Sequence, residues 1–255
     1  MNVAIVTSVL NRESVIENCL ESVSSQILPA DVTLTHLIRD GGSSDGTFEK
    51  LTAYQIKFPD DVKIFQGLDS GLYDGLNKSL SLAKDFDLVI LLHSDDVFAS
   101  SNTLHNLLTF VKSVKADVYC GDVEFVDGSS VNRQWIAKPE LLRFWYLGLT
   151  PPHVALCYTR SALNVASNYS IQYKVSSDFD YVIRLYKSEM RFVRVDGMKV
   201  IQRTGGASAA GIHSFVTTFL EDAQILRRHG VRLHFFFSFL KKSLKLRQFK
   251  CFSKQ

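Results

Sequence analysis

Two adjacent carboxylates directly follow the most apolar segment of the chain. Asp95 and Asp96 come after the run Leu88–Leu92, which has the length and composition of a strand buried on both faces. Two negative charges at such a point repel each other, and a divalent cation held there relieves the repulsion. We therefore expect a Mg²⁺ or Mn²⁺ site at this strand end. The alternative is a solvated turn in which Asp96 caps the next helix.

A glycine-rich acidic segment lies at a second junction between a strand-like and a helical stretch. It spans Asp40 to Thr47 (DGGSSDGT) and follows the strand-like run Leu34–Ile38. Asp40 ends that strand, where a carboxylate can accept hydrogen bonds from a base or a ribose. Asp45 or Thr47 also fits a helix N-cap in a glycine-rich turn. The segment is not G-x-G-x-x-G, which argues against a dehydrogenase.

Strand-like and helical segments alternate through the first hundred residues and would position these acids. The strand-like runs are Val3–Val9, Leu34–Ile38, Val62–Phe65 and Leu88–Leu92. Apolar residues at helical spacing follow each of them. The alternation predicts an α/β fold with a Rossmann-like, mostly parallel central sheet flanked by helices. Because ligands bind at the carboxyl ends of such strands, the acidic strand ends should share one edge.

Length and charge predict one domain with a basic tail. The chain has 255 residues, 46% of them hydrophobic, so we expect a single α/β domain over residues 1–225. Residues 226–255 carry nine Lys or Arg and no Asp or Glu, although the net charge of the chain is only +3. Such a tail favours an anionic surface as partner.

Aromatic and basic residues are interleaved in this tail. Its apolar residues fall partly at helical spacing: Leu233, Phe235, Phe236, Phe237, Phe239, Leu240 and Leu244. The pattern predicts an amphipathic helix that lies on an anionic membrane surface. The alternative is a helix that packs into the core and exposes a basic face. No nucleic-acid-binding motif accompanies the tail, so we expect no nucleic acid partner.

Four segments together resemble the family-2 glycosyltransferases of GT-A fold. They are Asn11-Arg12, the segment 40–47, DSGLYDGLNK at 69–78 and SDD at 94–96, in the order and spacing of the family. The resemblance extends to about Ser208 and includes bacterial enzymes that assemble O-antigen and other polysaccharides. It implies that residues 1–100 bind a nucleotide sugar and residues 101–225 the acceptor.

The resemblance assigns donor-binding roles position by position. Asp40 corresponds to the carboxylate that recognises uracil, and Thr7 and Val9 are expected to line the same base pocket. Asp69 and the stretch that ends at Lys78 correspond to the segment against ribose and diphosphate. Lys78 then pairs with phosphate, although a helix lysine facing solvent fits its position as well.

The acidic pair corresponds to the DXD motif of the family. Asp95 matches the metal-coordinating end of that motif, and Asp96 is expected to contact ribose, sugar or metal. His93 stands where the family commonly has the first aspartate, so metal binding depends on Asp95 and Asp96 alone.

The resemblance also assigns the acceptor side. Asp178 corresponds to the general base, and Ser177 stands where the family often has glutamate. Asp180 is expected on the acceptor side too, pointing elsewhere on the helix; the alternative is a structural acid of the first helical turn, favoured by the helix dipole. His153 resembles a histidine near sugar or acceptor, although a structural role after Pro-Pro suits it too. The segment 205–208, with Gly205, Gly206 and Ser208, matches a loop that closes over the diphosphate.

These assignments imply an inverting glycosyltransferase with a divalent cation. A hexose, glucose or galactose, would pass from a UDP-sugar to a lipid-linked saccharide such as GlcNAc-diphosphoundecaprenol and form a β-glycosidic bond. The rivals are a nucleotidyltransferase and a non-catalytic nucleotide-sugar-binding module. The first residues contain no basic region or cleavage site typical of a signal peptide. We therefore expect a cytoplasmic enzyme, peripheral on the inner membrane of a bacterium.

Overall fold

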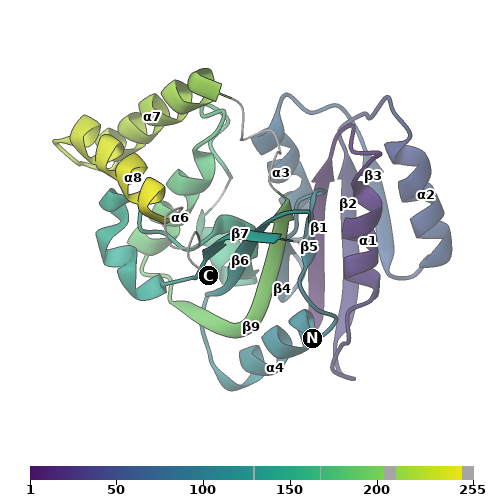
Figure 1. The fold of residues 1–255 in the computed structure, drawn as a ribbon. Helices are drawn as coiled ribbons and strands as arrows, with labels where there is room; N and C mark the ends of the chain where they lie inside the picture. Colours follow the sequence, from purple (N-terminus) through teal and green to yellow (C-terminus); the bar gives the residue numbers. More distant parts are fainter. Residues whose placement is uncertain (129, 167, 204–210, 249–255) are drawn as a thin grey trace.

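The first hundred residues form the parallel half of a central sheet (Figure 1). The computed structural model describes residues 1–128, 130–166, 168–203 and 211–248. The first strands are β1 (Asn2–Val9), β2 (Thr33–Asp40), β3 (Val62–Gln66) and β4 (Leu88–Leu91). They lie in the order β3-β2-β1-β4 with every pair parallel. The helices α1 (Ile16–Ser24), α2 (Thr47–Lys57) and α3 (Leu72–Ser81) connect them. The predicted alternation of strands and helices is confirmed.

The second half of the sheet mixes parallel and antiparallel pairs. Its strands are β5 (Asp96–Phe98), β6 (Val118–Asp127), β7 (Ser130–Trp135), β8 (Leu156–Thr159) and β9 (Phe192–Arg203). Strand β8 is antiparallel to both β4 and β6, β9 is parallel to β6, and β5 is antiparallel to β9. The helices here are α4 (Thr103–Ser113), α5 (Arg160–Ala166), α6 (Ser177–Lys187) and the 3₁₀ segments Pro139–Leu147 and His153–Ala155.

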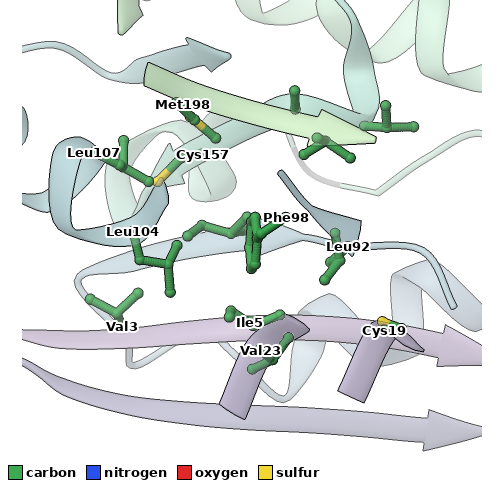
Figure 2. Packing of buried hydrophobic residues seen from close by; sticks show 14 of the residues in the cluster. Val3, Ile5, Cys19, Val23, Leu92, Phe98, Leu104, Leu107, Cys157 and Met198 are labelled. Atoms are coloured by element: carbon green, nitrogen blue, oxygen red, sulfur yellow. The ribbon is translucent and has the colours of Figure 1, made fainter. Parts of the chain in front are cut away.

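Both faces of the sheet are covered, so successive residues of the central strands enter two different cores. Val3 and Ile5 of β1 belong to a cluster with residues of α1, α2 and α4. Ala4 and Val6 belong to a second cluster with residues of α3, α5 and α6. Figure 2 shows the first cluster, where Cys19 and Val23 of α1 pack towards Ile5. Alternation of side chains along a strand explains why β1 and β4 read as continuous apolar runs.

The C-terminal residues form a helical hairpin that packs on α6. Helices α7 (Gly211–Arg228) and α8 (His234–Gln248) lie side by side, on the side of the sheet away from α1 and α2 (Figure 1). Ile225 and Leu226 of α7 share a core cluster with Phe179 and Ile183 of α6, against which Phe237 of α8 packs. The predicted helical tail is confirmed, but the expected boundary at residue 226 falls inside α7. Phe237 thus joins the core instead of the expected membrane face.

A buried ion pair links α7 and α8, the two helices of this hairpin. Lys241 Nζ lies 2.8 Å from Asp222 Oδ1, and both side chains are buried. Gly148, in the left-handed region at φ +73°, lies against the Lys241 chain, and a Cβ there would collide with it. In contrast, Leu233, Phe235, Phe236 and Phe239 are more than half exposed. The hairpin therefore has one face in the core and an apolar face outside.

No helix among the described residues is long and apolar enough to cross a membrane. Cys19, Cys120 and Cys157 are buried free thiols.

Candidate active site

The carboxyl ends of β1, β2 and β3 meet at one edge of the sheet, where Asp40 is completely buried. Asp40 pairs with Val9 of β1 and with Gln66 of β3 in the strand register. Its oxygens accept hydrogen bonds from the Ser43 backbone N–H at 3.2 Å and from Gln66 Nε2 at 3.3 Å. The Ser43 hydroxyl also donates to it and accepts from the Asn11 N–H at 2.9 Å. Asp40 therefore organises the glycine-rich loop against the segment after β1.

Thr7 and Val9, expected to line a base pocket, have buried side chains. Thr7 Oγ1 donates to the Leu92 carbonyl and lies 2.9 Å from His36 Nε2. Burial lowers the pKa of His36 to about 3, so this imidazole is neutral at physiological pH. In this structure the side chains of Thr7 and Val9 serve the core, and any contact they make with a base remains a prediction.

Asp69 and Lys78 belong to one network of ion pairs near the start of α3. Arg39 donates to Asp69 Oδ1 through Nε at 3.0 Å and Nη2 at 2.7 Å, and Lys78 Nζ lies 3.1 Å from the same oxygen. Lys78 also pairs with Asp74 at 2.7 Å. The Lys78 side chain is 40% exposed, so it is paired and still accessible to a phosphate. Arg39 is a member of this network that sequence reasoning missed.

Asp96 differs from Asp95 in its surroundings. The Asp96 carboxylate is buried in β5, and Gln202 Nε2 of β9 donates to its oxygens at 3.1 and 3.4 Å. Burial, followed by the charge of Asp95, raises the pKa of Asp96 well above its ordinary value. Asp95 is partly exposed. This placement favours Asp95 as the carboxylate that meets a ligand, with Asp96 behind it.

The residues around Asp95 suit a cation that arrives with a diphosphate. Within the described ranges no group of three or more His, Cys, Asp or Glu side chains could hold a metal ion. Mg²⁺, however, is commonly bound by one or two carboxylates together with substrate phosphates. One accessible carboxylate at this edge fits that mode. Burial is the main cause that lowers the pKa of His93 to about 4, so its imidazole is neutral beside Asp95.

Asp178 lies at the start of α6 and is held by two side chains from other elements. His153 Nδ1 lies 2.9 Å from Asp178 Oδ2, and the Tyr73 hydroxyl lies 3.3 Å from Oδ1. The ring of His153 in turn contacts that of His93 edge-on, with 6.0 Å between centroids. The predicted residues Asp178 and His153 therefore lie together, next to His93, which stands two residues before Asp95.

Asp180 points away from this group, as its place two residues further on the helix predicts. It is buried, with Arg184 Nε at 2.8 Å and His229 Nε2 at 2.8 Å. Hydrogen bonds from His229 and Arg184 outweigh burial and lower the pKa of Asp180. Its role in this structure is to join α6 to the end of α7. The expected loop residues Gly205, Gly206 and Ser208 lie outside the described residues.

Sequence reasoning also missed Tyr73 and Gln202. Tyr73 is inside the segment 69–78 that the motif singles out, so its phenol was available as a candidate. Gln202 reaches Asp96 only because β9 pairs with β5 across 106 positions of sequence. No local sequence pattern indicates such a pairing.

In open α/β sheets, ligands bind outside the carboxyl ends of the strands, which is where the acidic residues of this site lie. The family model of glycosyl transferase family 2 matches residues 4–175. The chain belongs to glycosyl transferase family 2, and it is a glycosyltransferase. The family prediction is thereby confirmed, and the nucleotidyltransferase alternative is set aside.

Two glycosyltransferases are described from among the curated relatives that match the sequence. A PGL/p-HBAD biosynthesis glycosyltransferase of Mycobacterium bovis (strain BCG / Pasteur 1173P2) is 27% identical over 90% of this chain and 87% of its own. The poly(ribitol-phosphate) beta-glucosyltransferase of Bacillus spizizenii (strain ATCC 23059 / NRRL B-14472 / W23) is also 27% identical, over 51% of this chain and 20% of its own.

Solved structures share the fold. TarS of S. aureus (residues 1–349, in complex with UDP-GlcNAc) matches 99% of this chain and 74% of its own, with a TM-score of 0.67 and 20% identity. The mannosyltransferase PcManGT of Pyrobaculum calidifontis, in complex with GDP-Man and Mn²⁺, matches 96% and 75%, with a TM-score of 0.64 and 12% identity. The expected GT-A fold is confirmed by these matches.

Proposed function

We propose that this glycosyltransferase transfers a hexose, glucose or galactose, from a UDP-sugar to a hydroxyl of a lipid-linked saccharide. The observation that carries the proposal is the position of His93. His93 stands two residues before Asp95, its ring lies 6.0 Å from that of His153, and His153 Nδ1 lies 2.9 Å from Asp178 Oδ2. The donor-side acid and the acceptor-side acid thus share one site, as transfer between two bound substrates requires.

The relatives support the choice of substrates. TarS was solved with UDP-GlcNAc and with UDP, which favours a uridine nucleotide, although the GDP-Man complex shows that the fold also accepts guanosine. One relative is named for a glycosyltransferase step of PGL/p-HBAD biosynthesis and another for β-glucosyl transfer to poly(ribitol-phosphate). We infer a role in the assembly of a bacterial surface glycan, such as O-antigen, on a carrier like GlcNAc-diphosphoundecaprenol.

The proposed reaction is a single displacement at the anomeric carbon. Asp178 takes the proton of the acceptor hydroxyl, and the acceptor oxygen forms the new bond to the anomeric carbon. The bond from that carbon to the diphosphate oxygen breaks, and UDP leaves with the electron pair. Attack opposite the leaving group converts an α-linked donor into a β-glycoside.

The second part of the proposal is a dependence on Mn²⁺ or Mg²⁺. Asp95 would hold the cation together with the diphosphate, and Asp96 would support Asp95 from the core. When bound, the cation supplies charge neutralisation for the departing UDP. Lys78, accessible and close to Asp69, is placed to add a second positive charge.

Metal removal should therefore stop turnover. We expect EDTA to abolish UDP release and Mn²⁺ or Mg²⁺ to restore it, because the diphosphate leaves poorly without charge neutralisation. Asp95→Ala should reproduce the loss in the presence of metal, whereas Asp60→Asn, an exposed acid on the surface, should not. UDP release can be followed by a coupled assay. Undiminished activity in EDTA would remove Asp95 from the metal role.

Loss of the base should separate catalysis from binding. We expect Asp178→Asn to lower kcat by about 10²- to 10⁴-fold, because an amide cannot accept the acceptor proton. The affinity for UDP, measured by calorimetry, should change little, since the base acts on the acceptor. An equal loss of UDP affinity would contradict the assignment. Unchanged turnover in both Asp178→Asn and Asp95→Ala would show that neither acid takes part in the transfer.

The third part of the proposal concerns the outer face of the α7–α8 hairpin. Exposed apolar residues occur on both helices of the hairpin, where Phe219 of α7 stacks on Phe235 of α8: Leu233, Phe235, Phe236 and Phe239, and on α7 Phe215, Val216 and Leu220. The exposed cations Arg227, Arg228 and Arg232 lie at the turn between the two helices. Apolar side chains among basic ones suit an anionic lipid surface, to which each cation adds on the order of 1 kcal/mol. We infer a peripheral enzyme on the cytoplasmic face of the inner membrane.

Polar substitution of this face should weaken membrane binding and spare catalysis. Truncation is unsuitable, because Phe237 and Lys241 belong to the core. We expect Phe235→Ser, Phe236→Ser and Phe239→Ser together to abolish sedimentation with anionic vesicles and raise KM for a lipid-linked acceptor only. Ile56→Ser, which changes an exposed apolar residue of α2, is the matched control. Unchanged sedimentation, or equal losses with a short soluble acceptor, would refute membrane docking.

A further inference from the structure

The carboxylate of Glu221, on α7, is buried and has no part in the mechanism above. It is only 8% exposed, and both of its oxygens accept hydrogen bonds from backbone N–H groups. Oε1 accepts from Lys174 at 2.7 Å, and Oε2 accepts from Val175 and Ser176, both at 2.9 Å. One side chain from the C-terminal hairpin therefore binds three consecutive residues almost fifty positions earlier in the sequence.

These three residues lead directly into α6, the helix that carries Asp178. The first N–H groups of a helix lack partners within it and attract a negative charge. Ser176 precedes α6, and its own side chain makes no capping bond to any described residue. Glu221 accepts instead from the N–H of Ser176 and of the two residues before it, so a carboxylate from another helix binds the segment at the start of α6. Without it, buried N–H groups would lose their partners at a substantial free-energy cost.

The opposite side of the same segment is fixed by α3. The Tyr73 hydroxyl lies 2.6 Å from the Val175 carbonyl oxygen. Val175 is thus bound through its N–H by Glu221 and through its C=O by Tyr73. Asp178 follows three residues later, within the first turn of α6, so its carboxylate moves with this anchored backbone.

The hairpin also contacts the residues that follow Asp178. Lys241 Nζ, paired with Asp222, lies 3.4 Å from the centre of the Phe179 ring. His229, at the end of α7, bonds Asp180. The contacts of α7 and α8 with residues 174–176, 179 and 180 therefore lie on both sides of Asp178 in the sequence.

We propose that Glu221 is a positioning residue for the general base. By binding the three N–H groups before α6, it sets the direction in which Asp178 points and holds that carboxylate within reach of His153. The inference rests on the proposed role of Asp178. It extends the catalytic unit to the C-terminal hairpin, which the family model does not cover.

A purely structural role for Glu221 makes a different prediction. A residue that only stabilises the fold lowers the amount of folded enzyme and leaves the turnover of each folded molecule unchanged. A residue that positions Asp178 lowers kcat in the folded protein, and its effect disappears once Asp178 can no longer act as a base. A double-mutant cycle between the two positions separates these cases.

The test compares Glu221→Gln with Asp178→Asn and with the double variant in the full chain. Gln keeps the size of the side chain but offers a single acceptor oxygen. We expect Glu221→Gln to lower kcat by about 10- to 100-fold, a range typical of a displaced catalytic group. UDP affinity by calorimetry should stay within about twofold, and on the Asp178→Asn background the further loss should be less than about twofold.

Two further variants keep the inference falsifiable. Leu107→Ala, on the buried side of α4 (Figure 2), lowers stability away from the site and should leave kcat per folded molecule unchanged. Glu221→Asp keeps the charge on a shorter chain, and it should lose less kcat than Glu221→Gln. Independent, multiplying losses in the double variant, or a Glu221→Gln enzyme that matches Leu107→Ala, would overturn the role of Glu221. Full activity in Asp178→Asn would instead refute the proposed base.

Discussion

The parallel pairing of β1 with β2 and β4 is the constraint on which the site depends. Because these strands run in one direction, their carboxyl ends reach the same edge, and the segments that follow them meet there. Asp40 is buried at the end of β2, and Asp95 follows β4. A change of register by one residue would turn these side chains to the other face of the sheet. The apolar residues on both faces of β1 and β4 fix that register.

The acceptor side is built in another way, from helices that meet across the second half of the sheet. Asp178 begins α6, and its neighbours come from α3, the 3₁₀ segment at His153 and the C-terminal hairpin. None of these elements holds the carboxylate alone. Buried charges recur in this region, in Asp180 with His229 and in Asp222 with Lys241. Removal of one partner from such a pair is strongly destabilising, because it leaves an uncompensated buried charge.

The sequence predicted the parts of the fold that local patterns encode. Alternating apolar runs indicated β1 to β4 and their helices, and the acidic motifs indicated the strand ends and the start of α6. The antiparallel insertion of β8 between β4 and β6 was not predictable, since it depends on contacts between distant segments. The hydrogen bond from Gln202 to the buried Asp96, and those from residues 174–176 to Glu221, could not be predicted for the same reason. The tail pattern indicated an amphipathic helix but did not separate the partly buried Phe237 from the exposed Phe235 and Phe239.

The central claim is that Asp178 activates an acceptor opposite the diphosphate in a single displacement. The configuration of the new glycosidic bond tests it most directly, and NMR of the purified product reports that configuration from the anomeric proton. With an α-linked UDP-hexose as donor, the account predicts a β-linked product formed without a covalent glycosyl-enzyme intermediate. An α-linked product would show retention and would contradict the single displacement.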